Sequence, residues 1–204
     1  MPTPAPDFYL ASASPRRREL LAQLRYRFAA LQVDIDETPQ PGETAAGLVL
    51  RLAGQKAAAG ARLVALNDPR PVLGADTAVS VDGRILGKPA TRDEAVAMLS
   101  LLSGREHHVL TGVALLHAGR LDTAQSATRV VFRPVSVAEM QRYWDTGEPR
   151  DKAGGYAIQG LAAAFVERIE GSYSGVVGLP LFETARLLQD SGVSGWQQDA
   201  PDHE

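Results

Sequence analysis

The sequence predicts a protein of the α/β class. Short runs rich in apolar and β-branched residues alternate along the chain with longer segments in which apolar residues recur at helical spacing. The 204 residues are enough to bury a substantial core, and no repeat, low-complexity linker or shift in composition divides them. We therefore expect one α/β domain, built either as a single body or as two small lobes.

Composition and charge exclude several classes of protein. The chain has no cysteine, which rules out disulfides and thiolate metal sites. A net charge of −3 gives no general attraction to nucleic acid, and no apolar run approaches the roughly 20 residues that a membrane helix needs. The first residues also lack the basic and apolar pattern of a signal peptide. We expect a cytoplasmic protein with neither a nucleic-acid nor a membrane partner.

The first predicted elements are a strand over residues 8–12 and a helix that begins at the Ser-Pro pair after it. Three arginines crowd the first turn of this helix, where the positive end of the helix dipole disfavours cations. Either these arginines are solvated, or they form an anion site together with free backbone N–H groups and two serine hydroxyls. We favour the anion site, whose residues are Ser12, Ser14, Arg16, Arg17 and Arg18.

A second strand is expected over residues 26–33, and it is followed by Asp34, Asp36 and Glu37. Three carboxylates this close together repel one another unless a cation lies among them. They form either an acidic surface loop or part of a site for a hard metal, since Mg²⁺ prefers one or two carboxylates together with phosphate oxygens of a substrate.

A helix over residues 43–62 and a β-hairpin come next. The helix has apolar residues at helical spacing, and its Lys56, taken alone, would face solvent. Two β-rich runs, residues 77–81 and 84–86, are separated by Asp82-Gly83, a dipeptide typical of type I′ turns. The pattern therefore predicts two antiparallel strands joined by a two-residue turn.

The hairpin brings an acid and an amine together. With a two-residue turn, Thr77 lies opposite Lys88 and Asp76 opposite Pro89, so that Asp76 and Lys88 are neighbours at the open end. Strict alternation nevertheless places their side chains on opposite faces. One interpretation is a solvated ion pair on the rim. The other is a ligand site, because Asp76 follows the apolar Val72-Leu73 and open α/β sheets bind ligands past the ends of buried strands.

The second half of the chain predicts a helix, two long paired strands, a helix, an irregular segment, a strand, a loop and a final helix. Two capping-box sequences, at residues 91–94 and 136–139, begin helices that end near Gly104 and Gly147. The other expected ranges are 108–117 and 121–132 for the paired strands, 148–160 for the irregular segment, 164–169 for the strand, 171–180 for the loop and 181–189 for the helix.

Two further groups of polar residues stand out in this half. The irregular segment carries Lys152, Gln159 and several glycines, and a glycine-rich loop with a lysine can wrap a ligand, although alone it is a weak signal. His107, His108 and His117 suggest a metal site, but they lie in an alternating strand pattern with a single adjacent acid. We interpret them as ordinary strand residues.

The charged residues selected so far indicate phosphoanhydride chemistry. Cations hold a polyphosphate, carboxylates hold Mg²⁺, and a carboxylate can accept a proton from an attacking water. The chain lacks a P-loop and a Gly-x-Gly-x-x-Gly sequence after a strand, which disfavours those two nucleotide-binding folds. The residues concerned are Arg16, Arg17, Lys56, Lys88 and Lys152 among the bases and Glu37 and Asp76 among the acids.

Eight short motifs follow one another in an order typical of a known family. They lie at residues 10–17 (LASASPRR), 74–77 (GADT), 87–89 (GKP), 102–104 (LSG), 147–149 (GEP), 151–154 (DKAG), 158–160 (IQG) and 177–180 (VGLP). Together they resemble the Maf-like nucleoside triphosphate pyrophosphatases from residue 8 to about residue 190. The resemblance implies a mixed α/β fold like that of inosine triphosphatases, with a long twisted central sheet flanked by helices and a substrate cleft between two lobes, often in a homodimer. We expect one such domain over residues 1–192 and a flexible tail over residues 193–204.

The resemblance also implies an activity and a set of site residues. Members hydrolyse a nucleoside triphosphate to the monophosphate and pyrophosphate with Mg²⁺ or Mn²⁺, in a house-cleaning role. Asp76 matches the proposed proton acceptor, Glu37 an acidic position tied to metal and water, and Lys88 a basic position at the phosphates. We therefore expect Asp76, Glu37 and Lys88 to be catalytic and Glu37 and Asp76 to hold the metal. The expected substrate-binding residues are Ser12, Arg16, Arg17, Lys56, Thr77, Lys152 and Gln159.

Three of the motifs distinguish branches within this family. Asp76-Thr77, the Asp-Lys-Ala-Gly at residues 151–154 and the Ile-Gln-Gly at residues 158–160 resemble the branch that acts on dTTP and UTP. The branch that acts on 7-methyl-GTP tends to have Asp-Gln, Asn-Cys-Ala-Gly and Glu-Gly at these places. A glutamine amide and a threonine hydroxyl can both donate and accept hydrogen bonds at the imide edge of a pyrimidine.

The sequence departs from the family pattern at two positions, and two alternative functions are consistent with it. Gly155 replaces an alanine and Gly175 an asparagine that many members have, and both glycines add backbone freedom beside the expected cleft. The alternatives are a 7-methyl-GTP pyrophosphatase of the same family and a nucleotide-binding regulator of septum formation.

Overall fold

One mixed sheet forms the frame of the fold. The computed structural model describes residues 5–65 and 68–195, and within them seven strands pair in the order β2-β1-β3-β5-β6-β7, with β4 also paired to β3. The strands are β1 (Phe8–Ala11), β2 (Phe28–Leu31), β3 (Val72–Val81), β4 (Arg84–Leu86), β5 (Glu106–His117), β6 (Arg120–Phe132) and β7 (Val166–Glu170).

The three longest strands run antiparallel through the whole molecule. The β3–β5 pairing extends from Val72 opposite Leu116 to Ser80 opposite His108, and β5 pairs with β6 along its full length. Both tight turns have the two positive φ angles that a type I′ turn requires, at Asp82-Gly83 and at Ala118-Gly119. The two predicted hairpins are therefore confirmed.

The other edge of β3 is interrupted. The parallel strand β1 pairs with β3 only as far as Ala11 opposite Gly74, and β4 pairs with it only from Val79 opposite Leu86 onward. Among the strand pairings of the described residues, residues 75–78 of β3 have no partner on this edge. Both faces of the sheet can therefore be reached at one place.

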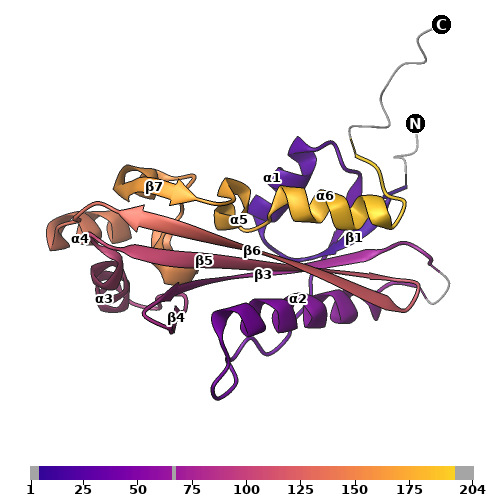
Figure 1. Cartoon of the computed structure of the whole chain (residues 1–204), viewed down its shortest axis with the longest axis horizontal. Helices are drawn as coiled ribbons and strands as arrows, with labels where there is room; N and C mark the ends of the chain where they lie inside the picture. Colours follow the sequence, from indigo (N-terminus) through magenta and orange to yellow (C-terminus); the bar gives the residue numbers. More distant parts are fainter. Residues whose placement is uncertain (1–4, 66–67, 196–204) are drawn as a thin grey trace, which may run out of the picture.

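Helices cover the sheet on both sides, which confirms the predicted class. Figure 1 shows α2 against one face of the long strands and α1, α5 and α6 on the other side. The helices are α1 (Pro15–Gln23), α2 (Ala45–Ala61), α3 (Arg92–Leu102), α4 (Val137–Asp145), α5 (Tyr173–Val177) and α6 (Leu181–Asp190). The helix α2 lies directly on the sheet at Gly74 and Gly112, where an added Cβ would come within 2.2 Å and 2.6 Å of the helix backbone.

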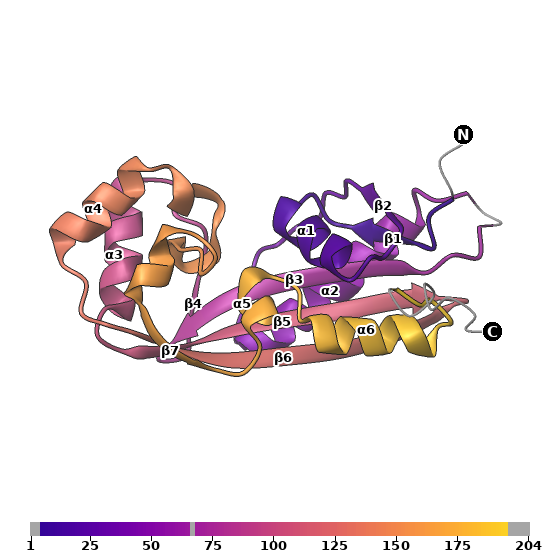
Figure 2. The ribbon, with the colours of Figure 1, turned by 90° about the horizontal axis from the view of Figure 1, so that it is seen from above.

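The remaining elements gather at the two ends of the long strands. In Figure 2, α1, β1 and β2 lie towards one end, and α3, α4 and β4 lie towards the other. The short 3₁₀ helices η1 (Glu148–Asp151), η2 (Ala153–Gly155) and η3 (Leu161–Phe165) occupy the predicted irregular segment and the residues after it. One hydrophobic core joins the two ends, since it includes Leu10 and Leu21 as well as Leu102 and Tyr143.

The expected position of Asp76 and its pairing with Pro89 are wrong. Asp76 lies inside β3, and the β3–β4 ladder has the predicted register but ends at Leu86. The carbonyl of Gly87 instead accepts a hydrogen bond from the N–H of Gly154 at 2.9 Å. This contact draws the chain away from β3, so that Lys88 does not pair with Thr77 on the β4 edge. On its other edge, Thr77 pairs with Thr111 of β5.

The predicted helix starts are confirmed in position, but the expected capping hydrogen bonds form at only some of them. Ser14 is the N-cap of α1, but its side chain makes no capping bond, and its N–H donates to Ser12 Oγ at 3.2 Å. The capping box at Ser136 is complete, whereas at the start of α3 the Glu94 carboxylate accepts from Ala90 N–H instead of Thr91 N–H. The segment predicted as a loop over residues 171–180 contains the short helix α5.

The chain remains packed beyond the last helix. Val193 is buried and belongs to the main core. Residues 196–204 of the expected tail, like residues 1–4, lie outside the described residues. Each helix in the described part of the chain is too short or too polar to cross a membrane.

Candidate functional site

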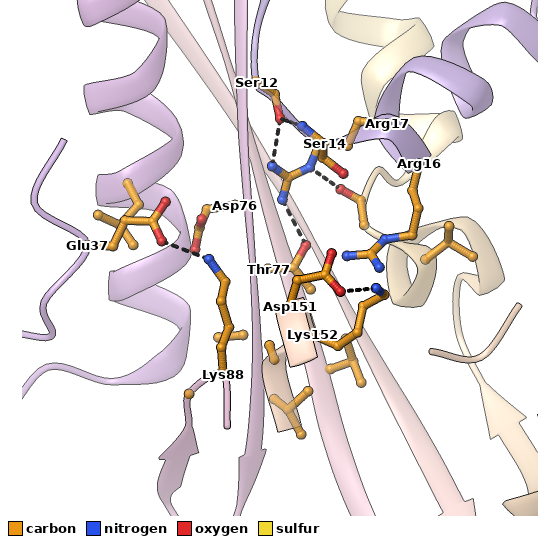
Figure 3. Close-up of a pocket in the computed structure, with 18 of the residues that line it drawn as sticks. Ser12, Ser14, Arg16, Arg17, Glu37, Asp76, Thr77, Lys88, Asp151 and Lys152 are labelled. Atoms are coloured by element: carbon orange, nitrogen blue, oxygen red, sulfur yellow. Dashed lines mark hydrogen bonds and ion pairs between the residues drawn. The ribbon is translucent and has the colours of Figure 1, made fainter. Parts of the chain in front are cut away.

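A cavity of about 520 Å³ lies beside the interrupted edge of β3. This volume is within the range of small-molecule and cofactor sites. All ten residues predicted as catalytic, metal-binding or substrate-binding line the cavity: Ser12, Arg16, Arg17, Glu37, Lys56, Asp76, Thr77, Lys88, Lys152 and Gln159. Figure 3 shows how eight of them lie around it.

Two carboxylates and two lysines form a continuous chain of contacts on one side of the cavity. Lys56 Nζ lies 2.7 Å from Asp76 Oδ1 and 2.6 Å from Glu37 Oε1. Lys88 Nζ lies 3.3 Å from the other oxygen of Glu37. Asp76 and Lys88 were expected to be direct neighbours. They are instead connected through Lys56 and Glu37.

The backbone brings this chain of contacts together from three distant segments. Asp76 is held on β3, Lys56 on α2, and Glu37 on the loop after β2. Lys56 has only 8 % of its surface exposed, so the expectation that it faces solvent is wrong. The cause is the close approach of α2 to the sheet, which aims the lysine at the strand that carries Asp76.

The acidic loop contributes one of its three carboxylates to the cavity. Glu37 lines it, whereas Asp36 accepts a hydrogen bond from Thr38 N–H at 2.9 Å, and Asp34 is outside the lining. Burial by itself would raise the pKa of Glu37. The hydrogen bond from Lys56 and the charges of Lys56 and Lys88 outweigh burial and hold this pKa below its ordinary value.

The first turn of α1 contributes two arginines to the opposite side. Arg17 is buried, and its guanidinium donates to Gly178 O at 2.7 Å, to Ser12 Oγ at 3.1 Å and to Thr77 Oγ1 at 3.3 Å. Arg16 lines the cavity without such a set of bonds, and Arg18 is exposed outside it. Burial lowers the pKa of Arg16 and of Arg17, yet a guanidinium keeps its charge at neutral pH.

The hydroxyl of Thr77 belongs to a buried relay. Thr111 Oγ1 donates to Gly175 O at 2.7 Å and lies 2.9 Å from Thr77 Oγ1. Since the hydrogen of Thr111 is used on Gly175, Thr77 is the donor between the two threonines, and Arg17 donates to Thr77 in turn. A ligand could therefore use Thr77 only as an acceptor.

Lys152 and Gln159 come from the irregular segment. Lys152 forms an ion pair with Asp151, which also lines the cavity, and Figure 3 shows this pair on the same side as Arg16. Gln159 is exposed and lies on a turn. Gly155, one of the two departures noted above, has φ +71°, a conformation in which an alanine would be strained.

The strand β3 presents its two faces to one cavity. Asp76 points to α2, where it meets Lys56. Thr77 points to the opposite face, where it meets Arg17 of α1 and the side chain of Thr111 on β5. Both line the cavity because the edge of β3 is unpaired between β1 and β4. The alternation of side chains therefore does not prevent one ligand from reaching both.

The charge of the cavity is opposite to the charge of the chain. Five cationic and three anionic side chains line it, whereas the whole chain carries a net charge of −3. Such a local excess of positive charge attracts a polyanion and raises its rate of association. The basic residues that were expected to hold a polyphosphate lie together in this cavity.

The carboxylates fit a metal that is shared with a ligand. In residues 5–65 and 68–195 no group of three or more His, Cys, Asp or Glu side chains is placed to hold a metal. Glu37 and Asp76 nevertheless approach one ammonium group from two sides, which is a position that a small cation can take. Two carboxylates suit Mg²⁺ or Mn²⁺ when phosphate oxygens complete the coordination shell.

Sequence reasoning did not select Thr111 and Asp151 as site residues. Thr111 carries no distinguishing signal, because a β-branched residue in a buried strand is common. Asp151 could have been found as the first residue of the Asp-Lys-Ala-Gly motif. The histidines are as interpreted: His107 Nε2 lies 2.8 Å from the hydroxyl of the buried Tyr156, in the core.

The fold and the cavity together define an α/β protein with a basic cavity large enough for a nucleotide. The model of the Maf-like protein family matches residues 7–191, and the chain belongs to this family. The resemblance inferred from the motifs is thereby confirmed.

Several relatives with about half of their residues identical cover nearly the whole chain. A protein from Saccharophagus degradans is 53 % identical over 197 residues, which is 96 % of this chain and 93 % of that protein. Relatives from Bordetella parapertussis and Hahella chejuensis are 55 % and 54 % identical over 93 % and 92 % of this chain, and over 94 % and 93 % of their own lengths. All three are named dTTP/UTP pyrophosphatase. Among solved structures, that of the Staphylococcus aureus Ham1 protein is similar with a TM-score of 0.42 and 14 % identity, over 61 % of this chain and 71 % of that one.

Proposed function

We propose that this protein hydrolyses dTTP and UTP to the nucleoside monophosphate and pyrophosphate. The observation that carries the proposal is the meeting of three carboxylates with five cations in one cavity of nucleotide size. The name shared by relatives at 53–55 % identity supports this choice of substrates. A house-cleaning role in the cytoplasm and a homodimer, as in other members, belong to the same proposal.

The reaction assigns one proton transfer and one displacement to the site. A water molecule attacks the α-phosphorus, a new O–P bond forms, and the bond from this phosphorus to the α,β-bridging oxygen breaks. Asp76 takes the proton of the water, and pyrophosphate leaves with the bridging oxygen. Lys56, Lys88 and Arg16 stabilise the negative charge that develops on the phosphates in the transition state. Electrostatic stabilisation of this kind is usually the largest single contribution to catalysis.

Glu37 and Asp76 are the residues that would hold a divalent cation. Mg²⁺ or Mn²⁺ bound there would neutralise phosphate charge and orient the triphosphate. Lys56, which contacts both carboxylates in this structure, would then be available to phosphate oxygens. The pKa of Glu37, which lies below its ordinary value, keeps this carboxylate ionised and ready to bind a cation at neutral pH.

Recognition of the base rests on Gln159 and Thr77. The Gln159 amide offers one donor and one acceptor group to the imide edge of thymine or uracil. Thr77 supplies an acceptor only, because its hydrogen is directed to Thr111. Gln159 therefore carries the larger share of the selection of pyrimidines.

A nucleotide panel tests the proposal. Purified protein with Mg²⁺ or Mn²⁺ should release pyrophosphate from dTTP and UTP faster than from purine triphosphates. Asp76→Asn should lower kcat by about 10²–10⁴-fold, the usual contribution of a general base. Asp93→Asn, at an exposed position of α3, is the control and should retain activity.

Two outcomes would overturn the proposal. A preference for 7-methyl-GTP would assign the chain to the other branch. Binding of nucleotides without release of pyrophosphate from any of them would indicate a regulator rather than an enzyme.

A further inference from the structure

The loop that carries Gln159 is a tight turn with an unusual support. Gly160 N–H donates to Ala157 O at 3.0 Å, which closes a four-residue turn over residues 157–160. Ala157 and Ile158 are buried, whereas Gln159 is exposed and lines the cavity. The position of the Gln159 amide therefore depends on what holds the two ends of this turn.

Tyr143 and Glu148 hold both ends. The Tyr143 hydroxyl donates to Glu148 Oε1 at 2.6 Å and accepts from Ala157 N–H at 3.1 Å. Glu148 Oε2 accepts from Leu161 N–H at 3.1 Å. The backbone N–H groups just before and just after the tip of the turn are thus bound to one tyrosine and carboxylate unit, which we call the Tyr143–Glu148 clamp.

The clamp is itself fixed by the fold. Tyr143 lies on α4, has 4 % of its surface exposed, and packs edge-to-face on Phe165 with ring centroids 5.3 Å apart. Glu148 follows α4 after Gly147, whose φ of +80° turns the chain back towards the tyrosine. The helix α4 and the turn that it supports are therefore connected directly through the clamp.

Gly160 supplies a second observation that points to the same contact. A Cβ at this position would lie 2.3–2.4 Å from the carboxylate atoms of Glu148. A side chain at residue 160 would therefore displace the Glu148 carboxylate from its place against the turn. The glycine of the Ile-Gln-Gly motif thus leaves room for the Glu148 carboxylate of the clamp.

We propose that Tyr143 and Glu148 are positioning residues that determine base specificity by fixing the Gln159 amide. The proposal rests on the proposed function, in which Gln159 contacts the pyrimidine. Neither residue lines the cavity. Their loss should consequently affect recognition of the base and leave phosphate binding and the chemical step unchanged.

Two conservative variants test the clamp. Tyr143→Phe removes only the hydroxyl, and Glu148→Gln keeps the shape of the side chain while losing its charge. Each should raise KM for dTTP and UTP by about 10-fold, as expected for the loss of one or two hydrogen bonds, with kcat within about 2-fold of the wild type. Competitive inhibition by pyrophosphate, which has no base, should be unchanged.

Two controls separate positioning from general damage. Tyr173→Phe alters an exposed tyrosine outside the cavity and should change neither KM nor kcat. In a Gln159→Ala background, Tyr143→Phe should add no further loss of discrimination between dTTP and dATP, because the group that it positions is absent. An equal loss for dTTP, dATP and pyrophosphate, or a further loss in the Gln159→Ala background, would overturn the proposal.

Hydrogen exchange provides a readout that does not depend on the substrate. In both clamp variants the amides of Ala157 and Leu161 should exchange about 10-fold faster than in the wild type, while amides of the central strands keep their protection. Unchanged exchange at the turn would refute the clamp even if the nucleotide panel supports the proposed function. A wild-type protein inactive on dTTP and UTP would refute the proposed function while the exchange result still decides on the clamp.

Discussion

Replacing Gly74 by alanine should separate the helix that carries Lys56 from the strand that carries Asp76. The new Cβ would lie 2.2 Å from Ala53 O and 2.6 Å from Ala57 N, both in the backbone of α2. Ordinary contact between such atoms begins near 3.4 Å, so α2 and β3 must move apart by about 1.2 Å. Overpacking of this kind costs about 1–3 kcal/mol of stability.

The same movement should impair the reaction. The Lys56–Asp76 contact of 2.7 Å would lengthen to nearly 4 Å, beyond the range of a hydrogen bond. A displacement of about 1 Å at a catalytic group can lower the rate by about 10²-fold. We therefore expect kcat/KM for dTTP to fall by roughly this factor in Gly74→Ala, while the variant remains folded.

Urea unfolding and steady-state release of pyrophosphate measure the two effects. Gly47→Ala is the matched control on α2, because its Cβ would make only ordinary contacts of 3.4 Å and 3.6 Å. In a Lys56→Met background, Gly74→Ala should cost little further activity, since the contact that it disturbs is already gone. An equal loss of kcat/KM in both backgrounds would refute this explanation.

Three further predictions concern other parts of the molecule. Burial lowers the pKa of His107 to about 4, so between about pH 6.5 and pH 4 the unfolded chain binds a proton that the folded protein does not. The free energy of unfolding should therefore fall by about 3 kcal/mol in total as the pH drops through this range. Urea unfolding at several pH values should show that His107→Gln loses this dependence and that His108→Gln, at an exposed position, keeps it. Thr111→Val deletes both hydrogen bonds of a fully buried hydroxyl and should cost about 1–3 kcal/mol in thermal or urea unfolding, whereas Thr123→Val at an exposed position should be within error of the wild type. Chelation with EDTA should abolish release of pyrophosphate and added Mg²⁺ or Mn²⁺ should restore it; activity that survives chelation would contradict the assignment of a metal to the two carboxylates.

Local chemistry explains why the strands and helices were predictable. The register of the β3–β4 hairpin follows from the Asp-Gly turn alone, since the turn fixes which residues face each other. The helix starts at Thr91 and Ser136 depend on contacts within four residues. Such features need no knowledge of the rest of the chain.

Contacts between distant segments explain what the sequence did not reveal. The hairpin ends early because Gly154 binds the carbonyl of Gly87, a contact between residues far apart in the chain. Lys56 faces the sheet because α2 packs closely on glycines of two strands. The helical spacing of apolar residues in α2 does not predict how closely the helix approaches the sheet. The site residues were selected from the charge pattern and from the family resemblance, and their distances required the structure.

The interruption of the sheet at residues 75–78 bears on the behaviour of the protein at high concentration. An unpaired strand edge is a template on which another chain can add a strand and begin to aggregate. Here the unpaired stretch is bounded by β1 at one end and by β4 at the other. It is shorter than a strand of ordinary length, about 5–6 residues. The backbone groups of residues 75–78 can thus be reached by a small molecule, while the unpaired edge is too short for a second chain to add a strand of ordinary length.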